Sequence, residues 1–138
     1  MLYSLKRYEE AEPLYQKALE IQQKLVRENP EVYEPDLALY SNNYANMLYS
    51  LKRYEEAEPL YQKALEIRCI LAENNPQIYD ADKAISYHGL ANSLCVLKRY
   101  EEAEPLYREA LKYYQVLPSS SENVKNIQVI LGLIKQHQ

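Results

Sequence analysis

The sequence has no Phe and no Trp, only 2 Gly, 2 Cys and 2 His, and no apolar run of the roughly 18 residues that a membrane span needs. So few glycines argue against turn-rich β folds and against glycine-built phosphate loops. The net charge of −4 argues against nucleic acid as a partner, because nucleic-acid binders normally carry a basic face. We expect no membrane and no nucleic-acid partner. Because the polar opening residues do not resemble a signal peptide, we also expect a cytoplasmic protein.

The side chains that usually carry catalysis are scarce. Cys69 and Cys95 stand far apart, without the Cys-x-x-Cys spacing of metal or redox sites. His88 and His137 belong to no nucleophile or metal motif. We therefore expect no enzyme, no catalytic residue, no metal and no cofactor. The alternative, a hydrolase or transferase, requires a clustered polar pocket. A deep pocket holding His88 with a strongly shifted pKa would indicate one.

A period of 46 residues runs through the chain. The string Lys-Arg-Tyr-Glu-Glu-Ala-Glu-Pro-Leu-Tyr begins at Lys6, Lys52 and Lys98, so both intervals are 46 residues. Residues 1–21 are identical to residues 47–67. A constant period of this size is typical of a solenoid, in which each unit buries its apolar face against its neighbours.

Each period predicts two helices. Apolar residues recur at steps of three and four over residues 37–51 and again from Tyr54, which is the pattern of one helical face. The break over residues 51–53 is short, so the two helices must be antiparallel neighbours. Asn75-Pro76 ends the second helix, because the residue before a proline avoids the α region.

The helix starts are less evenly marked. Asp80 is the expected N-cap of the next first helix, and Pro35 suits the first helical position in the earlier copy. Pro13, Pro59 and Pro105 fall inside the second helices, where we expect them to be tolerated because they lie near the helix start.

The second helix of each copy carries Tyr-x-x-Ala-x-x-x-Tyr-x-x-Ala, and the first helices carry a matching small residue at Ala45 and Ala91. This pattern resembles the tetratricopeptide repeat. The Asn-Asn-x-Ala that precedes Tyr-Glu-Glu-Ala-Glu-Pro-Leu-Tyr is similar to the longer repeats of the kinesin light chain type. Three features depart from the common pattern, namely the longer period, a lysine where the family usually has glycine between the helices, and Ser41 where a bulky residue usually stands near the start of the first helix. The motif residues are Tyr8, Ala11, Tyr15 and Ala18; Tyr54, Ala57, Tyr61 and Ala64; and Tyr100, Ala103, Tyr107 and Ala110.

The resemblance implies an all-α fold. We expect an α-solenoid of antiparallel helix pairs, with about two and a half 46-residue tetratricopeptide repeats and a C-terminal helix. The expected bounds are a truncated first repeat over 1–29, a second repeat over 35–75, a third over 80–117 and a capping helix over 119–136.

Tetratricopeptide solenoids take peptides or helices in a concave groove along their first helices, so the resemblance implies a protein-interaction scaffold with a protein or peptide partner. Asparagines suit such a groove, because a carboxamide can donate to and accept from a peptide backbone. Alternatively, these residues are solvated polar side chains on an ordinary helix face. The groove residues expected on the first helices are Tyr3, Leu39, Asn42, Asn43, Asn46, Tyr49, Ser50, Ile85, His88, Asn92 and Cys95.

The two ends of the sequence leave a second function open. Met1 aligns with Met47, so most of the first helix that would cover residues 8–28 is missing, and we expect either a longer array or cover by another chain. This favours, as the alternative, an architectural or self-assembling repeat segment with no external ligand. A homodimer by swapping and a head-to-tail contact both fit.

The C-terminal segment predicts a closing helix. Ser119 and Glu122 have the spacing of a capping box. The apolar stripe that follows aligns with a first helix, and Val129 and Leu133 widen it beyond what one neighbour needs. The stripe consists of Val124, Ile127, Ile130, Leu131 and Ile134.

Overall fold

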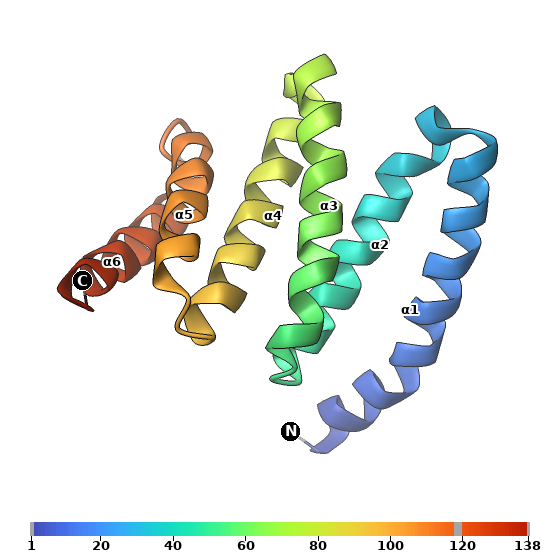
Figure 1. The fold of residues 1–138 in the computed structure, drawn as a ribbon, viewed down its shortest axis with the longest axis horizontal. Coiled ribbons are helices and arrows are strands. Elements are labelled where there is room, and N and C mark those ends of the chain that lie inside the picture. Colours follow the sequence, from blue (N-terminus) through green and yellow to red (C-terminus); the bar gives the residue numbers. More distant parts are fainter. Residues whose placement is uncertain (1, 118–119, 138) are drawn as a thin grey trace.

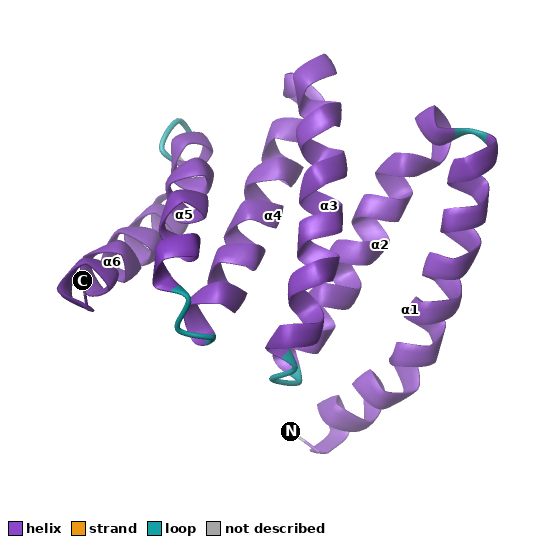
Figure 2. Ribbon diagram, viewed as in Figure 1, coloured by secondary structure: helices purple, strands orange, loops and turns teal. Residues whose placement is uncertain are grey.

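A computed structural model describes the backbone of residues 2–117 and 120–137 and the side chains of residues 7–117 and 120–136. Over those residues the chain forms helices and short turns without strands (Figure 2). The helices are α1 (Leu2–Glu28), α2 (Pro30–Ser50), α3 (Tyr54–Asn74), α4 (Pro76–Val96), α5 (Tyr100–Tyr114) and α6 (Ser121–His137).

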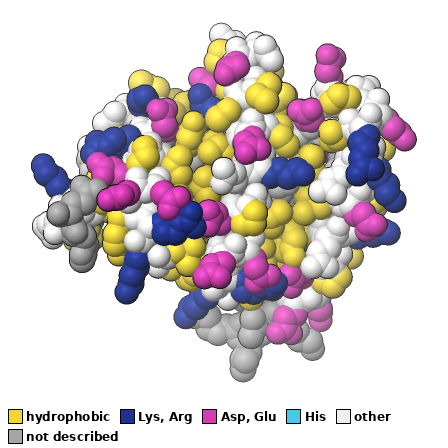
Figure 3. All heavy atoms as spheres, in the orientation of Figure 1, with side chains coloured by type: hydrophobic (Ala, Val, Ile, Leu, Met, Phe, Trp, Pro, Cys, Tyr) yellow, Lys and Arg dark blue, Asp and Glu magenta, His cyan; other side chains and the backbone are white. Residues whose placement is uncertain are grey.

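The helices stack in chain order, each packing chiefly on the one before it and the one after it (Figure 1). The pairs α2–α3 and α4–α5 are antiparallel, and α1 and α6 lie at opposite ends of the row. The expected all-α solenoid is therefore confirmed. In the space-filling view, hydrophobic side chains lie between the helices, while acidic and basic side chains are scattered over the ridges (Figure 3).

A tight turn joins the helices of each pair. Lys52 has φ 62°, and Lys98 has φ 63° in the equivalent turn. The amide of Lys52 donates to Tyr49 O at 2.9 Å, and the amide of Arg53 donates to Leu48 O at 2.8 Å. These two bonds form a Schellman motif, whose left-handed position glycine usually fills. The short break expected at residues 51–53 is confirmed.

The first helices begin earlier than expected. Asn75 is the N-cap of α4 and Pro76 its first residue, so the expectation that Asp80 caps this helix was wrong. In the same way α2 begins at Pro30, and Pro35 lies inside it. A proline at the first helical position costs no hydrogen bond, because that amide has no partner within the helix, so each Asn-Pro both ends one helix and starts the next.

The core lies between the first helices, α2, α4 and α6, and the second helices, α1, α3 and α5. The fully buried Ala57 and Ala64 lie on one face of α3, and the long aromatic rings of Tyr61 and Tyr107 are buried beside them. Small side chains allow the helix axes to approach, and the large rings fill the remaining space. Pro59 and Pro105 lie near the starts of α3 and α5, as expected. Pro13 lies near the middle of α1, so the expectation of a place near the helix start was wrong there, because α1 continues through the segment that forms a turn in the later copies.

Helix α1 departs from the repeat. The letters that form the turn at residues 51–53 recur at residues 5–7, yet there they continue one unbroken helix from Leu2 to Glu28. A left-handed lysine is strained, and packing between two paired helices offsets that strain in the later copies. No first helix packs on α1 ahead of this segment in the described chain, so the backbone keeps its helical hydrogen bonds instead.

Helix α6 closes the other end of the row. Its residues Ile127 and Ile134 are buried, and the rest of the expected stripe is partly buried against the same core. α6 packs on α5, as a first helix packs on the second helix before it. Ser119, the expected capping residue, lies outside the described residues.

Candidate functional site

Two neighbouring hollows lie along the first helices. One, of about 380 Å³, lies between α1 and α2, and the other, of about 350 Å³, extends from α2 across α4 to α6. Asn46 lines both, so the two hollows adjoin at this side chain, and we treat them together as one candidate groove. We call this the first-helix groove; its lining is Arg7, Tyr8, Ala11, Tyr15, Asn43, Asn46, Met47 and Ser50 in the first hollow, and Asn46, Tyr49, Tyr61, Ile85, His88, Gly89, Asn92, Tyr114 and Asn123 in the second.

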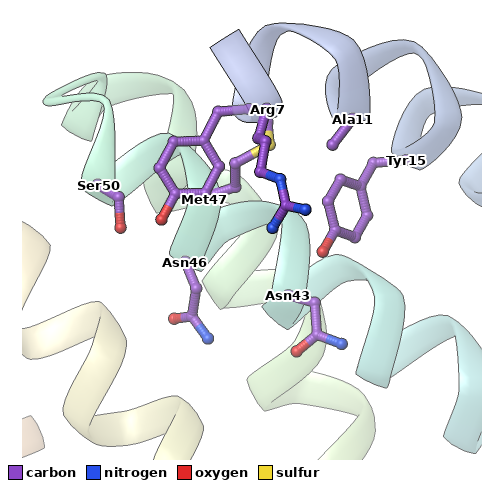
Figure 4. Close-up of a pocket in the computed structure, with 8 residues that line it drawn as sticks. Arg7, Ala11, Tyr15, Asn43, Asn46, Met47 and Ser50 are labelled. Carbon is purple, nitrogen blue, oxygen red and sulfur yellow. The ribbon is translucent and has the colours of Figure 1, made fainter. Parts of the chain in front are cut away.

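Most of the residues expected in a groove come together here. Figure 4 shows Asn43 and Asn46 leaving α2 on one side, with Arg7 and Tyr15 reaching toward them from α1. The expected residues that line the first-helix groove are Asn43, Asn46, Tyr49, Ser50, Ile85, His88 and Asn92.

Asn42 does not belong to this set. It is 3% exposed, and its Oδ1 accepts a hydrogen bond of 3.0 Å from the Ser86 hydroxyl. The Arg68 guanidinium donates to the same hydroxyl at 2.9 Å. Asn42 therefore joins α2 to α4 inside the stack, and its predicted place in the groove was wrong. The prediction assumed that α2 buries a single apolar stripe, but a helix with neighbours on two sides also buries some of its polar positions.

Two further expected residues are not among the described side chains that line the groove. Leu39 is exposed outside both hollows. Cys95 is a half-buried free thiol, also outside them. Tyr3 lies in α1, and its side chain is outside the described residues.

The two groove asparagines are held in the same way one period apart. The Tyr61 hydroxyl donates to Asn46 Oδ1 at 2.5 Å, and the Tyr107 hydroxyl donates to Asn92 Oδ1 at 2.6 Å. Each tyrosine belongs to the second helix of the same repeat. With its oxygen engaged, each carboxamide keeps its Nδ2 as the donor for a ligand.

The charges on the groove are sparse. Among its described lining residues there is no carboxylate, although the chain as a whole carries 20 acidic residues. Arg7 and His88 supply the basic groups. Burial lowers the pKa of His88, whose Nδ1 lies 3.4 Å from the Tyr114 hydroxyl. His88 is therefore a neutral hydrogen-bonding group near pH 7.

Sequence patterns missed the aromatic walls of the groove. Tyr15 and Tyr61 were assigned to packing as motif residues, and they also reach the hollows. Tyr114 lies near the end of α5, outside any repeated motif. The signal that could have found Tyr61 is its place 15 residues after Asn46, a spacing that recurs between Asn92 and Tyr107.

Other site types find little support in the described residues. No three His, Cys, Asp or Glu side chains in the described part of the chain could together hold a metal ion. None of its helices is long and apolar enough to pass through a bilayer.

Stacked antiparallel helix pairs with a groove along the first helices define a helical-repeat protein of the α-solenoid class. Tetratricopeptide repeat profiles match residues 1–70 and 84–117, and the first match alone spans half of the 138 residues. The chain belongs to the tetratricopeptide repeat family. Repeats of this family generally mediate protein–protein interaction, and their fold is typically non-catalytic.

A solved structure shares the fold. The crystal structure of BtubC (BKLC) from P. vanneervenii superposes with a TM-score of 0.71 at 23% sequence identity, covering 95% of this chain and 50% of that one. The chain thus spans about half the length of that protein. Among curated proteins, no sequence matches the chain.

Proposed function

We propose that the chain is a protein-interaction scaffold that binds a peptide segment or a helix in the first-helix groove. The observation that carries this proposal is the pair of asparagines, Asn46 and Asn92, one period apart and each fixed by a tyrosine hydroxyl. A repeated, oriented amide donor suits a ligand whose own acceptors repeat along its length, as the carbonyls of a peptide do.

The walls of the groove support the same class of ligand. Tyr49 and Ile85 supply apolar surface, and the Ile85 side chain is exposed. An exposed apolar side chain beside oriented polar donors gives a peptide both a side-chain contact and a backbone contact. The fixed carboxamides also reduce the ordering cost of binding, because their rotamers are already set.

The experiment is affinity capture with two double variants. Asn46→Ala, Asn92→Ala removes both groove donors, and Gln62→Ala, Asn74→Ala removes two exposed carboxamides outside the groove. Partners captured by the wild type should be lost with the first variant and kept with the second. Circular dichroism of both variants establishes that they are folded.

The position of the partner is tested independently of affinity. A photo-crosslinking residue placed at Ile85 lies in the groove, and one placed at Ile70 lies on an exposed position outside both hollows. Crosslinks from position 85 and none from position 70 are expected. Capture that is unaffected by the double alanine variant, with crosslinks only from position 70, would show that partners bind elsewhere.

A further inference from the structure

The chain has two glycines, Gly89 and Gly132, and both lie within helices. Glycine is a poor helix former, because its backbone loses more freedom on folding than that of any other residue. At Gly132, in α6, an added Cβ would meet no heavy atom within 4 Å. At Gly89, in the second half of α4, a neighbouring side chain occupies the space that a Cβ would need. Only Gly89 therefore has a packing reason to be glycine.

The Tyr61 ring lies directly against the backbone of Gly89. A Cβ built on Gly89 would stand 2.5 Å from Tyr61 Cε1 and 2.9 Å from both Cδ1 and Cζ. Carbon atoms in contact are normally about 3.5–4.0 Å apart. Tyr61 is 2% exposed and belongs to the core, so a shift of its ring disturbs the packing around it. The close approach of α4 to this ring therefore requires a residue without a side chain.

The same ring carries the hydroxyl that orients Asn46. That hydroxyl donates to Asn46 Oδ1 at 2.5 Å, and it is attached to Cζ, one of the atoms that a Cβ at Gly89 would crowd. Asn46 lies on α2, Tyr61 on α3 and Gly89 on α4, and all three line the second hollow. One chain of contacts thus connects the backbone of the third repeat with a groove donor of the second.

The preceding repeat carries a side chain at the equivalent position. Asn43 precedes Gly89 by 46 residues, and Tyr15 precedes Tyr61 by the same interval. Tyr15 is only half-buried, and its ring stacks on Tyr44 with the ring centroids 5.6 Å apart. Figure 4 shows both Asn43 and Tyr15 at the first hollow. A ring in the place of Tyr61 would collide with the Cβ of Asn43, so the two equivalent tyrosines lie differently against the following helix.

We infer that Gly89 is a positioning residue for the first-helix groove, because it allows the Tyr61 ring to pack against α4 and so sets the direction of the Asn46 carboxamide. Where the inference concerns ligand affinity, it rests on the function proposed above. A side chain at position 89 displaces the ring, breaks the bond to Asn46 Oδ1 and frees the carboxamide to rotate. The bond between Tyr107 and Asn92, formed one period later, is left intact.

The first experiment compares alanine at the two glycines by urea denaturation. Alanine is the better helix former, so Gly132→Ala, in open space, should raise the denaturation midpoint. Gly89→Ala is the same substitution inside another helix, yet it should lower the midpoint, because the Tyr61 ring must move. A midpoint raised by both substitutions would overturn the inference, because the added methyl group would then have found room.

The second experiment observes Asn46 itself, without a ligand. In proton–nitrogen NMR spectra, the side-chain amide signals of Asn46 should shift in Gly89→Ala and in Tyr61→Phe, because both variants lose the same hydrogen bond. The side-chain signals of Asn92 should move far less in both variants and thereby report an intact neighbouring repeat. Gly132→Ala should leave both asparagines unchanged. Asn46 signals that stay in place in Gly89→Ala would contradict a positioning role.

The third experiment measures affinity for a peptide selected from a displayed random library against the wild-type protein. Isothermal titration should show binding weakened about threefold or more by Gly89→Ala, with no further loss when this change is added to Tyr61→Phe. Losses that multiply in the double variant would instead show that the methyl group obstructs the ligand directly, and would overturn the inference.

Asn46→Ala separates this inference from the proposed function. Binding weakened by Asn46→Ala but not by Gly89→Ala would overturn the positioning role and leave the groove proposal intact. Binding unaffected by Asn46→Ala would overturn the groove proposal, and the denaturation and NMR results would still decide whether Gly89 positions the ring.

Discussion

The Tyr61 hydroxyl donates to Asn46 Oδ1 across the helix pair, so a residue of the second helix orients a carboxamide that faces the groove. The same bond recurs between Tyr107 and Asn92. One side-chain pair therefore links the packing of each repeat to the surface it presents. Tyr61→Phe should cost about 0.5–1.5 kcal/mol of unfolding free energy by loss of this bond. Chemical denaturation measures the loss, and Tyr33→Phe, which removes a hydroxyl outside the first-helix groove, serves as the comparison.

Alkaline pH should destabilise the protein through its buried tyrosines. Burial raises the pKa of Tyr61 and Tyr107 well above the usual value, and burial with the Cys69 thiol raises the pKa of Tyr87 to about 12. The unfolded chain ionises near pH 10, so this stability is complete below about pH 10 and is lost as pH rises toward the folded pKa. For Tyr87 the window is between about pH 10 and about 12.

Ultraviolet titration measures this directly, because the chain has no Trp to mask the tyrosinate signal. Late ionisation of a subset of tyrosines, coinciding with loss of helical circular dichroism, is expected. Titration of all 15 tyrosines together near pH 10 in the folded protein would contradict the burial described.

The turn lysines provide a matched pair of substitutions. Lys52→Gly should stabilise the protein by about 1 kcal/mol, because glycine adopts a positive φ without the strain of a side chain. Lys6→Gly is the same substitution in an identical stretch of sequence, but Lys6 lies within α1. There glycine should destabilise by up to about 1 kcal/mol. Urea denaturation of both variants measures the two changes in unfolding free energy. Changes of the same sign would contradict a left-handed Lys52 and a helical Lys6.

A second matched pair of substitutions tests the greater exposure of α1 relative to α3. Ala57→Leu adds bulk at a fully buried position and should cost about 1–3 kcal/mol by overpacking. Ala11→Leu, within an identical stretch, adds the same bulk at a half-buried position and should cost clearly less. Equal losses of unfolding free energy would show that Ala11 is as tightly packed as Ala57.

Arg68 offers a test of the polar bridge inside the stack. It is 5% exposed, and its guanidinium donates to Ser86 Oγ and, at 3.3 Å, to the Asp82 carbonyl. Arg68→Ala should destabilise by about 2–4 kcal/mol, because it removes a long buried side chain and leaves these acceptors without their donor. Arg68→Met keeps most of the volume and should cost less. Thermal and urea unfolding of both variants give the two values.

The repeat made most of the fold predictable from sequence. The identical strings at Lys52 and Lys98 predict identical turns, and both are present. The same string at Lys6 forms a helix, because the turn depends on a neighbouring helix and not on local letters alone. Local sequence therefore determined the helices, and tertiary packing determined whether the repeated string forms a turn or continues a helix.

The candidate site was predictable only in part. Asn46 and Asn92 follow from the period, and both line the groove. Asn42 and Asn43 are adjacent asparagines on one helix, so the sequence gives no reason to treat them differently. Asn42 is nevertheless buried, because Ser86 on the next repeat provides a hydrogen-bond partner. The tyrosine hydroxyls that orient the asparagines involve residues 15 positions apart on two helices, a relationship that helical periodicity does not encode.

The most direct test of the proposed scaffold is the affinity of a groove-binding peptide for a variant that changes only the amide donors. A peptide is first selected from a displayed random library against the wild-type protein. Asn46→Asp, Asn92→Asp keeps an oxygen for the tyrosine hydroxyls and removes both Nδ2 donors, so the fold should be retained. Isothermal titration should show binding weakened about tenfold or more, while Gln62→Glu, Asn74→Asp, which adds the same charge outside the groove, should bind like the wild type. Equal affinity for all three proteins would contradict a binding role for the first-helix groove.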